Sequence, residues 1–187
     1  MVAFPNTRSR LPRFRTPLRR PFARLLRSEN GAAAVEFAII ITPFMLSVFS
    51  FIELGFVLLA QEELQTATTQ ASRLVMTGIA KNQSLTVAQL EQQVCAHLDP
   101  TFVCANIFVN VQTFTTFSSI SRINPLKNGA VNTASLSYSI GNPGDIVLMQ
   151  VFYQLPVITA VLGTSLTNMN GNYRLIQATA VFRNEPY

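Results

Sequence analysis

The residues best suited to chemistry lie near position 31, where a basic segment meets a long apolar one. Residues 31–37 read GAAAVEF. The small side chains here leave the backbone open to a protease. If the bond between Gly31 and Ala32 is cut, Ala32 gains an α-amine that is mostly charged at neutral pH. On a helix, Glu36 stands four residues from that amine, one turn away, and can offset its charge within its own chain or in a neighbouring subunit.

Glu36 also has a simpler interpretation. A carboxylate in the first turn of a helix stabilises it through the helix dipole, by about 0.3–1 kcal/mol. A charge in the middle of a bilayer costs about 2.5–3.5 kcal/mol on insertion scales, and less near the interface. A carboxylate beside an apolar run is therefore expected to have a function. The sequence leaves two open: compensation of the Ala32 amine and interaction with the helix dipole.

A second group of chemically capable residues contains Cys95, His97, Asp99 and Cys104. The spacing C-x-H-x-D-x4-C is not a common zinc pattern, so we expect a Cys95–Cys104 disulfide rather than a metal site. Such a bridge would contribute about 2–3 kcal/mol on the chain-entropy model. A Cys95–His97 nucleophile pair is disfavoured, because residues two apart on a helix face different ways. We therefore predict no enzyme, no cofactor and no metal.

The charge of the chain is concentrated at its N-terminal end. Residues 1–31 hold eight arginines and one acid, whereas residues 32–187 hold six basic and eight acidic residues. A basic arm beside an apolar run is typical of the cytoplasmic side of a membrane helix, and it does not favour nucleic-acid binding. The far side is then oxidising, where a disulfide is the default. The arginines expected to set this topology are Arg19, Arg20, Arg24 and Arg27.

The apolar run itself covers residues 37–60 and contains one charge, Glu53. At about 1.5 Å per residue it reaches roughly 36 Å, enough to cross a hydrocarbon core of about 30 Å, so membrane lipid is an expected partner. Pro43 predicts a kink that a membrane helix tolerates. Glu53 is a candidate for contact with a partner helix inside the membrane, or it reaches the interface.

Beyond the apolar run, the pattern predicts an α+β head. Apolar residues at helical spacing continue the first helix to about residue 80, and the face formed by Val87, Leu90, Val94 and Leu98 predicts a second helix over 86–98, capped by Thr86. Alternation predicts an antiparallel sheet of about four strands. The expected strands are 107–114, a hairpin of 135–140 with 145–153, and 173–182 after an Asn-Gly turn. Residues 115–134 remain unassigned.

These features resemble a known family. The stretch RSENGAAAVEFAIIITPFM, residues 27–45, is similar to the processing site of TadE-like (TadE/TadG) pseudopilins of the tight-adherence (Flp) branch of type IV pili. In that family a prepilin peptidase cuts after a glycine, and a glutamate and an aromatic residue follow at the fifth and sixth mature positions. The resemblance thus assigns processing to Gly31 and Ala32 and assembly to Glu36 and Phe37, and Pro43 also fits. The end of the chain resembles some TadE/TadG relatives more weakly.

The resemblance implies a minor pilin-like subunit whose partners are a prepilin peptidase, other pilins and pseudopilins, and the pilus assembly platform. The expected organisation is a cytoplasmic leader (1–31), a transmembrane helix (32–60) and a pilin-like head (61–187). That places a single-pass protein in the bacterial inner membrane with its head in the periplasm, associated with the pilus. The major pilin of this branch is little more than a helix, so a head of this size favours a minor or initiating component.

Three alternatives remain open at this point. The chain could be an uncleaved, signal-anchored envelope protein for binding or adhesion. It could be a membrane-anchored envelope enzyme, although the head barely offers the clustered titratable residues that a catalytic pocket needs. It could be a secreted protein that ordinary signal peptidase releases near Ala60.

Overall fold

The computed structural model describes residues 31–157 and 166–186. The chain divides into two compact units, Met1–Met45 and Leu46–Tyr187. The four arginines predicted to set the topology, and most of the predicted leader, lie outside the described residues.

The described part of the first unit is the beginning of helix α2 (Ala32–Met76). From Ala32 to Met45 every side chain is exposed except that of Ile41, which is half-buried. An apolar helix surface of this kind is normally covered by lipid or by other helices. Within the described residues, α2 is the one helix long and apolar enough to cross a membrane, which confirms the predicted long apolar helix.

In the second unit, α2 becomes the core helix of the head. The buried apolar side chains of α2 follow helical spacing and belong to one hydrophobic cluster with the sheet. Thr68 and Ser72 are buried too, and their hydroxyls donate to the carbonyls of Leu64 (2.7 Å) and Thr69 (2.8 Å). The helix thus satisfies its own buried polar groups. The buried apolar residues of α2 are Val57, Ala60, Leu64, Ala67, Ala71 and Val75.

The short helix α3 (Ile79–Asn82) and the helix α4 (Val87–Ala96) follow α2. Thr86 caps α4 as predicted: its hydroxyl accepts from the amide of Gln89 (3.3 Å), and the Gln89 side chain accepts from the amide of Thr86 (2.8 Å). This reciprocal pair is a capping box. Leu90, Val94 and Leu98 are buried, whereas Val87, also expected on this face, is exposed.

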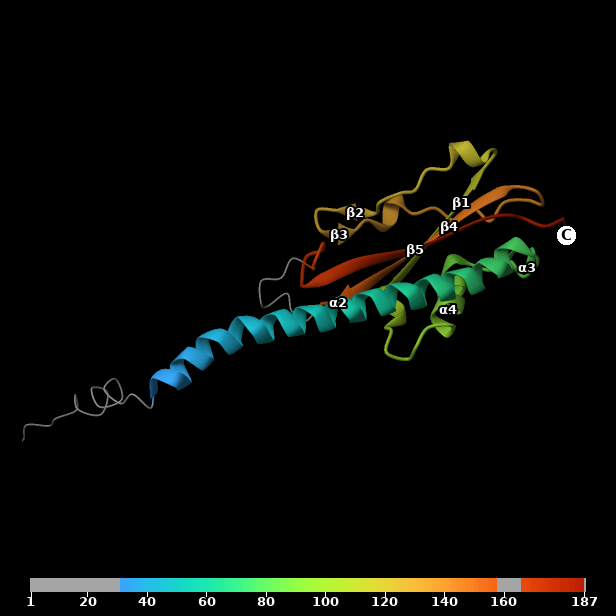
Figure 1. Ribbon diagram of the computed structural model, residues 1–187. Helices are drawn as coiled ribbons and strands as arrows, with labels where there is room; N and C mark the ends of the chain where they lie inside the picture. The colour runs from blue at the N-terminus through green and yellow to red at the C-terminus, as the bar shows by residue number, and fades with distance from the viewer. Residues whose placement is uncertain (1–30, 158–165, 187) are drawn as a thin grey trace, which may run out of the picture. The chain divides into compact units, whose positions relative to one another are not determined.

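The sheet consists of β1 (Ile107–Phe114), β4 (Ile146–Pro156) and β5 (Tyr173–Arg183), antiparallel in the order β1-β4-β5 (Figure 1). The central strand β4 is buried continuously from Ile146 to Tyr153, because both of its faces are covered. On one face, Val109, Val151 and Ala178 lie side by side across the three strands and join the cluster that contains α2 and α4. The predicted α+β fold with a small antiparallel sheet is confirmed.

The predicted hairpin between 135–140 and 145–153 is wrong. Residues 135–140 run parallel to the outer edge of β1 instead: the amide of Val111 donates to the carbonyl of Ser137 (2.8 Å), and the amide of Ser139 donates to that of Val111 (2.9 Å). The reason is that a strand has only two edges. Long ladders to β1 and β5 occupy both edges of β4. Gly141 (φ 73°) and Gly144 (φ 84°) turn the intervening loop.

The segment that the sequence left unassigned covers the second face of the sheet. It carries the short pair β2 (Leu126–Lys127) and β3 (Ala130–Val131), on the opposite side of the sheet from α2 (Figure 1). A buried polar pair fastens this segment to the sheet. Asn110 donates to the Gln150 side-chain carbonyl (3.2 Å), which also accepts from the amide of Ile123 (3.2 Å).

Candidate processing and assembly site

At the N-terminal junction, Ala32 and Glu36 lie on the same helix, four residues apart. Gly31 directly precedes α2, which begins at Ala32, and Ala32, Ala33, Ala34 and Glu36 are exposed. Side chains on an α-helix tilt toward its N-terminus, so Glu36 leans toward the turn that begins with Ala32. A cut after Gly31 would leave the new amine one turn from this carboxylate.

The simpler interpretation of Glu36 also stays open. Glu36 lies in the second turn of α2, because the first turn contains no acidic residue. The effect of the helix dipole on a charge is weaker there than in the first turn.

Phe37 and Pro43 lie in the exposed apolar part of α2. Phe37 is 64% exposed, as an aromatic side chain that packs against another helix or lipid would be. Pro43 lies inside α2, which continues on both sides of it. The Thr42 hydroxyl donates to the carbonyl of Ala38 (2.8 Å), a side-chain hydrogen bond in the turn where Pro43 supplies no amide. The kink at Pro43 and the assembly role of Phe37 stay predictions.

Glu53 lies farther along α2, in the second unit, and is partly buried. It stands one turn before Val57, where the core of the head begins. Its predicted contact with a partner helix remains a prediction.

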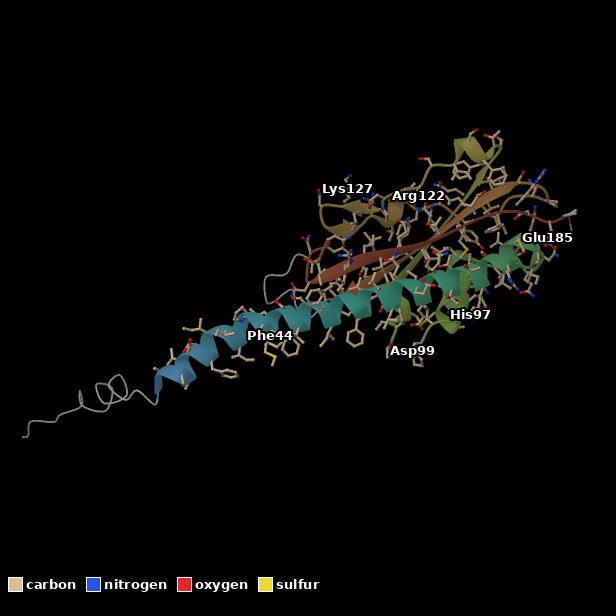
Figure 2. All side chains as sticks on the ribbon, in the orientation of Figure 1. Phe44, His97, Asp99, Arg122, Lys127 and Glu185 are labelled. Atoms are coloured by element: carbon tan, nitrogen blue, oxygen red, sulfur yellow. A yellow bond between two sulfur atoms is a disulfide. The ribbon has the colours of Figure 1, made fainter. Side chains whose placement is uncertain are left out.

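The predicted disulfide between Cys95 and Cys104 is present, with the two Cα atoms 5.6 Å apart. Because each sulfur is bonded to the other, neither supplies a thiolate for a metal or for nucleophilic attack. His97 and Asp99 belong to the loop that this disulfide closes and project below α2, while Arg122 and Lys127 project from the other side of the sheet (Figure 2). The described residues contain no group of three or more His, Cys, Asp or Glu placed to hold a metal.

The loop closed by the disulfide is fixed at several points. The Asp99 carboxylate accepts from the amide of Thr101 (2.9 Å), and hydrogen bonds to Thr101 hold the pKa of Asp99 below its ordinary value. The amide of Asp99 donates to the carboxylate of Glu63 on α2. The amide of Val103 donates to the Tyr153 hydroxyl (3.2 Å), and the Phe102 ring packs on the Tyr153 ring with centroids 4.8 Å apart.

Polar side chains also bond the two outer edges of the sheet. The Gln65 amide donates to the carbonyl of Thr179 (3.0 Å) and accepts from its amide (3.1 Å) on β5. The Glu91 carboxylate accepts from the amide of Val109 (3.2 Å) on β1, and burial raises the pKa of Glu91. Neither residue stands out in the sequence, because the backbone group that each one bonds lies 114 residues away for Gln65 and 18 residues away for Glu91. The only sequence signal is a polar residue beside an apolar stripe.

The exposed face of α2 in the head is polar. It forms one wall of an open groove of about 670 Å³ lined by Glu62, Gln65, Thr66, Thr69, Gln70, Arg73 and His97. Amides and hydroxyls dominate this lining, and the charged groups come from separate turns. The groove thus shows a solvated polar surface rather than a paired acid and base.

Comparison with known proteins bears on the first part of this site. No curated protein and no solved structure matches the chain. Residues 31–73 match the family model described as TadE-like protein. The match begins at Gly31 and covers the apolar part of α2 and its first turns in the head. The resemblance seen in the sequence is therefore confirmed over this segment: residues 31–73 are similar to the TadE-like family.

Proposed function

We propose that this chain is a minor pilin-like subunit, a pseudopilin, for the assembly of tight-adherence type IV pili. In this proposal a prepilin peptidase cuts it after Gly31. The observation that carries the proposal is the junction 31–37, which opens an exposed apolar helix within the TadE-like segment. Glu36 has the spacing from Ala32 that charge compensation requires.

The proposed mechanism is assembly rather than catalysis. Residues 1–31 form the cytoplasmic leader, 32–60 cross the inner membrane, and 61–187 form a periplasmic head. Cleavage frees the Ala32 amine, and Glu36 offsets its charge when apolar helices leave the bilayer to pack together. Unpaired charges are costly in such a bundle. The partners are the peptidase, other pilins and pseudopilins, and the assembly platform.

The head supports a minor role. It has its own hydrophobic cluster, which contains side chains from α2, α4 and all three strands of the main sheet. The major pilin of this branch is little more than a helix, so a chain with a separately packed head differs from the bulk subunit of the filament. We therefore place the chain at an initiating or accessory position, associated with the pilus.

The mature N-terminus tests this proposal directly. Intact mass of the membrane-derived protein should give a chain that begins at Ala32, and Gly31→Trp should leave the chain full-length. Gly55→Trp is the matched control: a Cβ at Gly55 meets no atom within 4 Å, and this glycine lies in the same helix far from the cut. The control should be processed normally.

Either of two other results would contradict the proposal. An uncut chain in both the wild type and the variants would indicate a signal-anchored envelope protein for binding or adhesion. A chain beginning near Gln61 would indicate a secreted head.

A further inference from the structure

The head overlaps the end of the apolar run instead of beginning after it. Val57 and Ala60 are 4% and 8% exposed and belong to the core of the head, although the sequence assigns both to the membrane span. On the same turns, Phe56 and Leu59 are 65% and 68% exposed. One side of this stretch therefore packs on the head while the other side remains uncovered and apolar.

Side chains of the head border this uncovered surface: Pro156 is exposed, and Phe102 and Leu155 are partly buried against the core. Phe56 and Leu59 line a shallow groove of about 270 Å³ together with Phe102, Leu155 and Pro156. We refer to these five residues as the apolar rim. They come from α2, from the disulfide-closed loop and from the end of β4, so the rim surrounds the point where the head meets the apolar helix.

The rim is held rigidly in this position. Phe102 stacks on Tyr153, and the next residue, Val103, donates its amide to the Tyr153 hydroxyl. The disulfide closes the loop on α4. A loop fixed in this way holds Phe102 partly buried against the core and leaves the neighbouring Val103 exposed.

The charged groups near the rim already have polar partners. Glu63, which also lines the groove, accepts from the amide of Asp99, and it lies one turn beyond Leu59, about 6 Å farther along α2. Arg174 pairs with Leu155 across β4 and β5 and donates to the carbonyl of Leu166 (2.8 Å). Glu63 and Arg174 thus lie at the edge of the rim that faces the head, whereas Glu53 lies about one turn before Phe56 on α2.

We propose that the apolar rim rests in the interfacial layer of the phospholipid bilayer, so that the head is seated on the membrane surface. The exposed apolar surface of α2 is continuous with the rim, because the exposed residues Phe49, Phe51 and Ile52 directly precede Phe56 on the helix. Water cannot cover such a surface without cost, and aromatic side chains favour the interface. Because Val57 is packed in the core, no free linker separates the head from the membrane. This inference rests on the membrane anchoring in the proposed function.

Tryptophan fluorescence offers a clean test, because the chain contains no tryptophan. The full chain is reconstituted in phosphatidylcholine vesicles whose acyl chains are either brominated near the headgroup or unmodified. Phe102→Trp reports on the rim. Val103 is not one of the five rim residues, but it follows Phe102 directly and is 54% exposed, so Val103→Trp is a second reporter beside the rim that leaves the Phe102–Tyr153 stacking intact.

Two further variants calibrate the measurement. Phe49→Trp lies in the exposed apolar part of α2 and should lose most of its emission in brominated vesicles. Phe117→Trp lies in the short turn η3 (Phe117–Ser119), beyond the end of β1 that is opposite the rim, and should keep its emission. The proposal expects both rim reporters to be quenched and blue-shifted, as Phe49→Trp is.

Three results would overturn the proposal. Rim reporters that are blue-shifted but not quenched would show that protein, such as a second copy or a pilin helix, covers the rim. Rim reporters that behave like Phe117→Trp would place the rim in water. If Phe49→Trp is also unquenched, the membrane anchoring itself fails, and with it the basis of the proposed function.

Discussion

Single polar side chains close the edges of the sheet and fasten its outer cover. Gln65 bonds both backbone groups of Thr179, Glu91 bonds the amide of Val109, and Gln150 bonds the amide of Ile123. An exposed strand edge invites pairing with other chains, and side-chain bonds of this kind block it. Residues that look like ordinary surface polar residues in the sequence are therefore structural in the head.

Glu91 makes the stability of the head depend on pH. Burial raises its pKa in the folded state above the ordinary value of 4.5, so above that value the folded state holds the proton more tightly than the unfolded state does. The wild type therefore loses stability as the pH rises from about 4.5 through the folded-state pKa. Glu91→Gln does not titrate and keeps an acceptor for Val109. Its free energy of unfolding minus that of the wild type should increase between pH 4 and pH 7 in urea titrations. A difference that is flat or falls with pH would contradict this assignment.

Glu36 is a second single residue whose proposed role, charge compensation after a cut at Gly31, can be tested. Glu36→Gln should be cut normally, because the change leaves the bond after Gly31 intact. It should nevertheless give severalfold less protein in the sheared pilus fraction, because the Ala32 amine is then uncompensated among apolar helices. Glu62→Gln, at an exposed position of α2 in the head, is the control and should assemble like the wild type. Equal assembly of all three proteins would argue against charge compensation.

The loop between α4 and β1 is closed by the Cys95–Cys104 disulfide. Cys95 and Cys104 are nine residues apart in sequence, so their disulfide closes a short loop that carries Phe102 and Val103. The double substitution Cys95→Ser, Cys104→Ser should lower the free energy of unfolding by about 2–3 kcal/mol on the chain-entropy model. Urea unfolding of the full chain in detergent measures this loss. A reductant should destabilise the wild type and leave the double variant unchanged, and an effect on both would point to another cause.

The whole molecule is asymmetric in charge, and this asymmetry predicts its orientation. Eight arginines precede Gly31, and basic residues set topology when they lie within about 15–20 residues of the membrane span. Replacing Arg24 and Arg27 by Gln should therefore lower the fraction of chains with the head outside the cytoplasm. Replacing Arg8 and Arg10 by Gln, the same charge change farther away, should have less effect. Activity of alkaline phosphatase fused after residue 187 measures that fraction, and equal effects of the two pairs would refute this interpretation.

The sequence by itself determined the features that depend on neighbouring residues. Apolar content determined the long helix, helical spacing determined most of the buried face of α2, and the Thr86 motif determined the start of α4. Alternation gave β1 its observed bounds, because one face of this strand packs in the core and the other face is less buried, which produces a period of two along the sequence. The TadE-like junction was also readable, since its residues are contiguous.

Only the tertiary structure decided which strands pair. The hairpin expected next to β4 was wrong, because β1 and β5, both distant in sequence, occupy its two edges. The same holds for the buried Asn110–Gln150 pair and for the overlap of the head with the apolar run at Val57. A single sequence reveals periodicity along the chain, but a contact such as Gln65–Thr179 depends on how two distant segments pack. That packing places the apolar rim where the core of the head begins on α2.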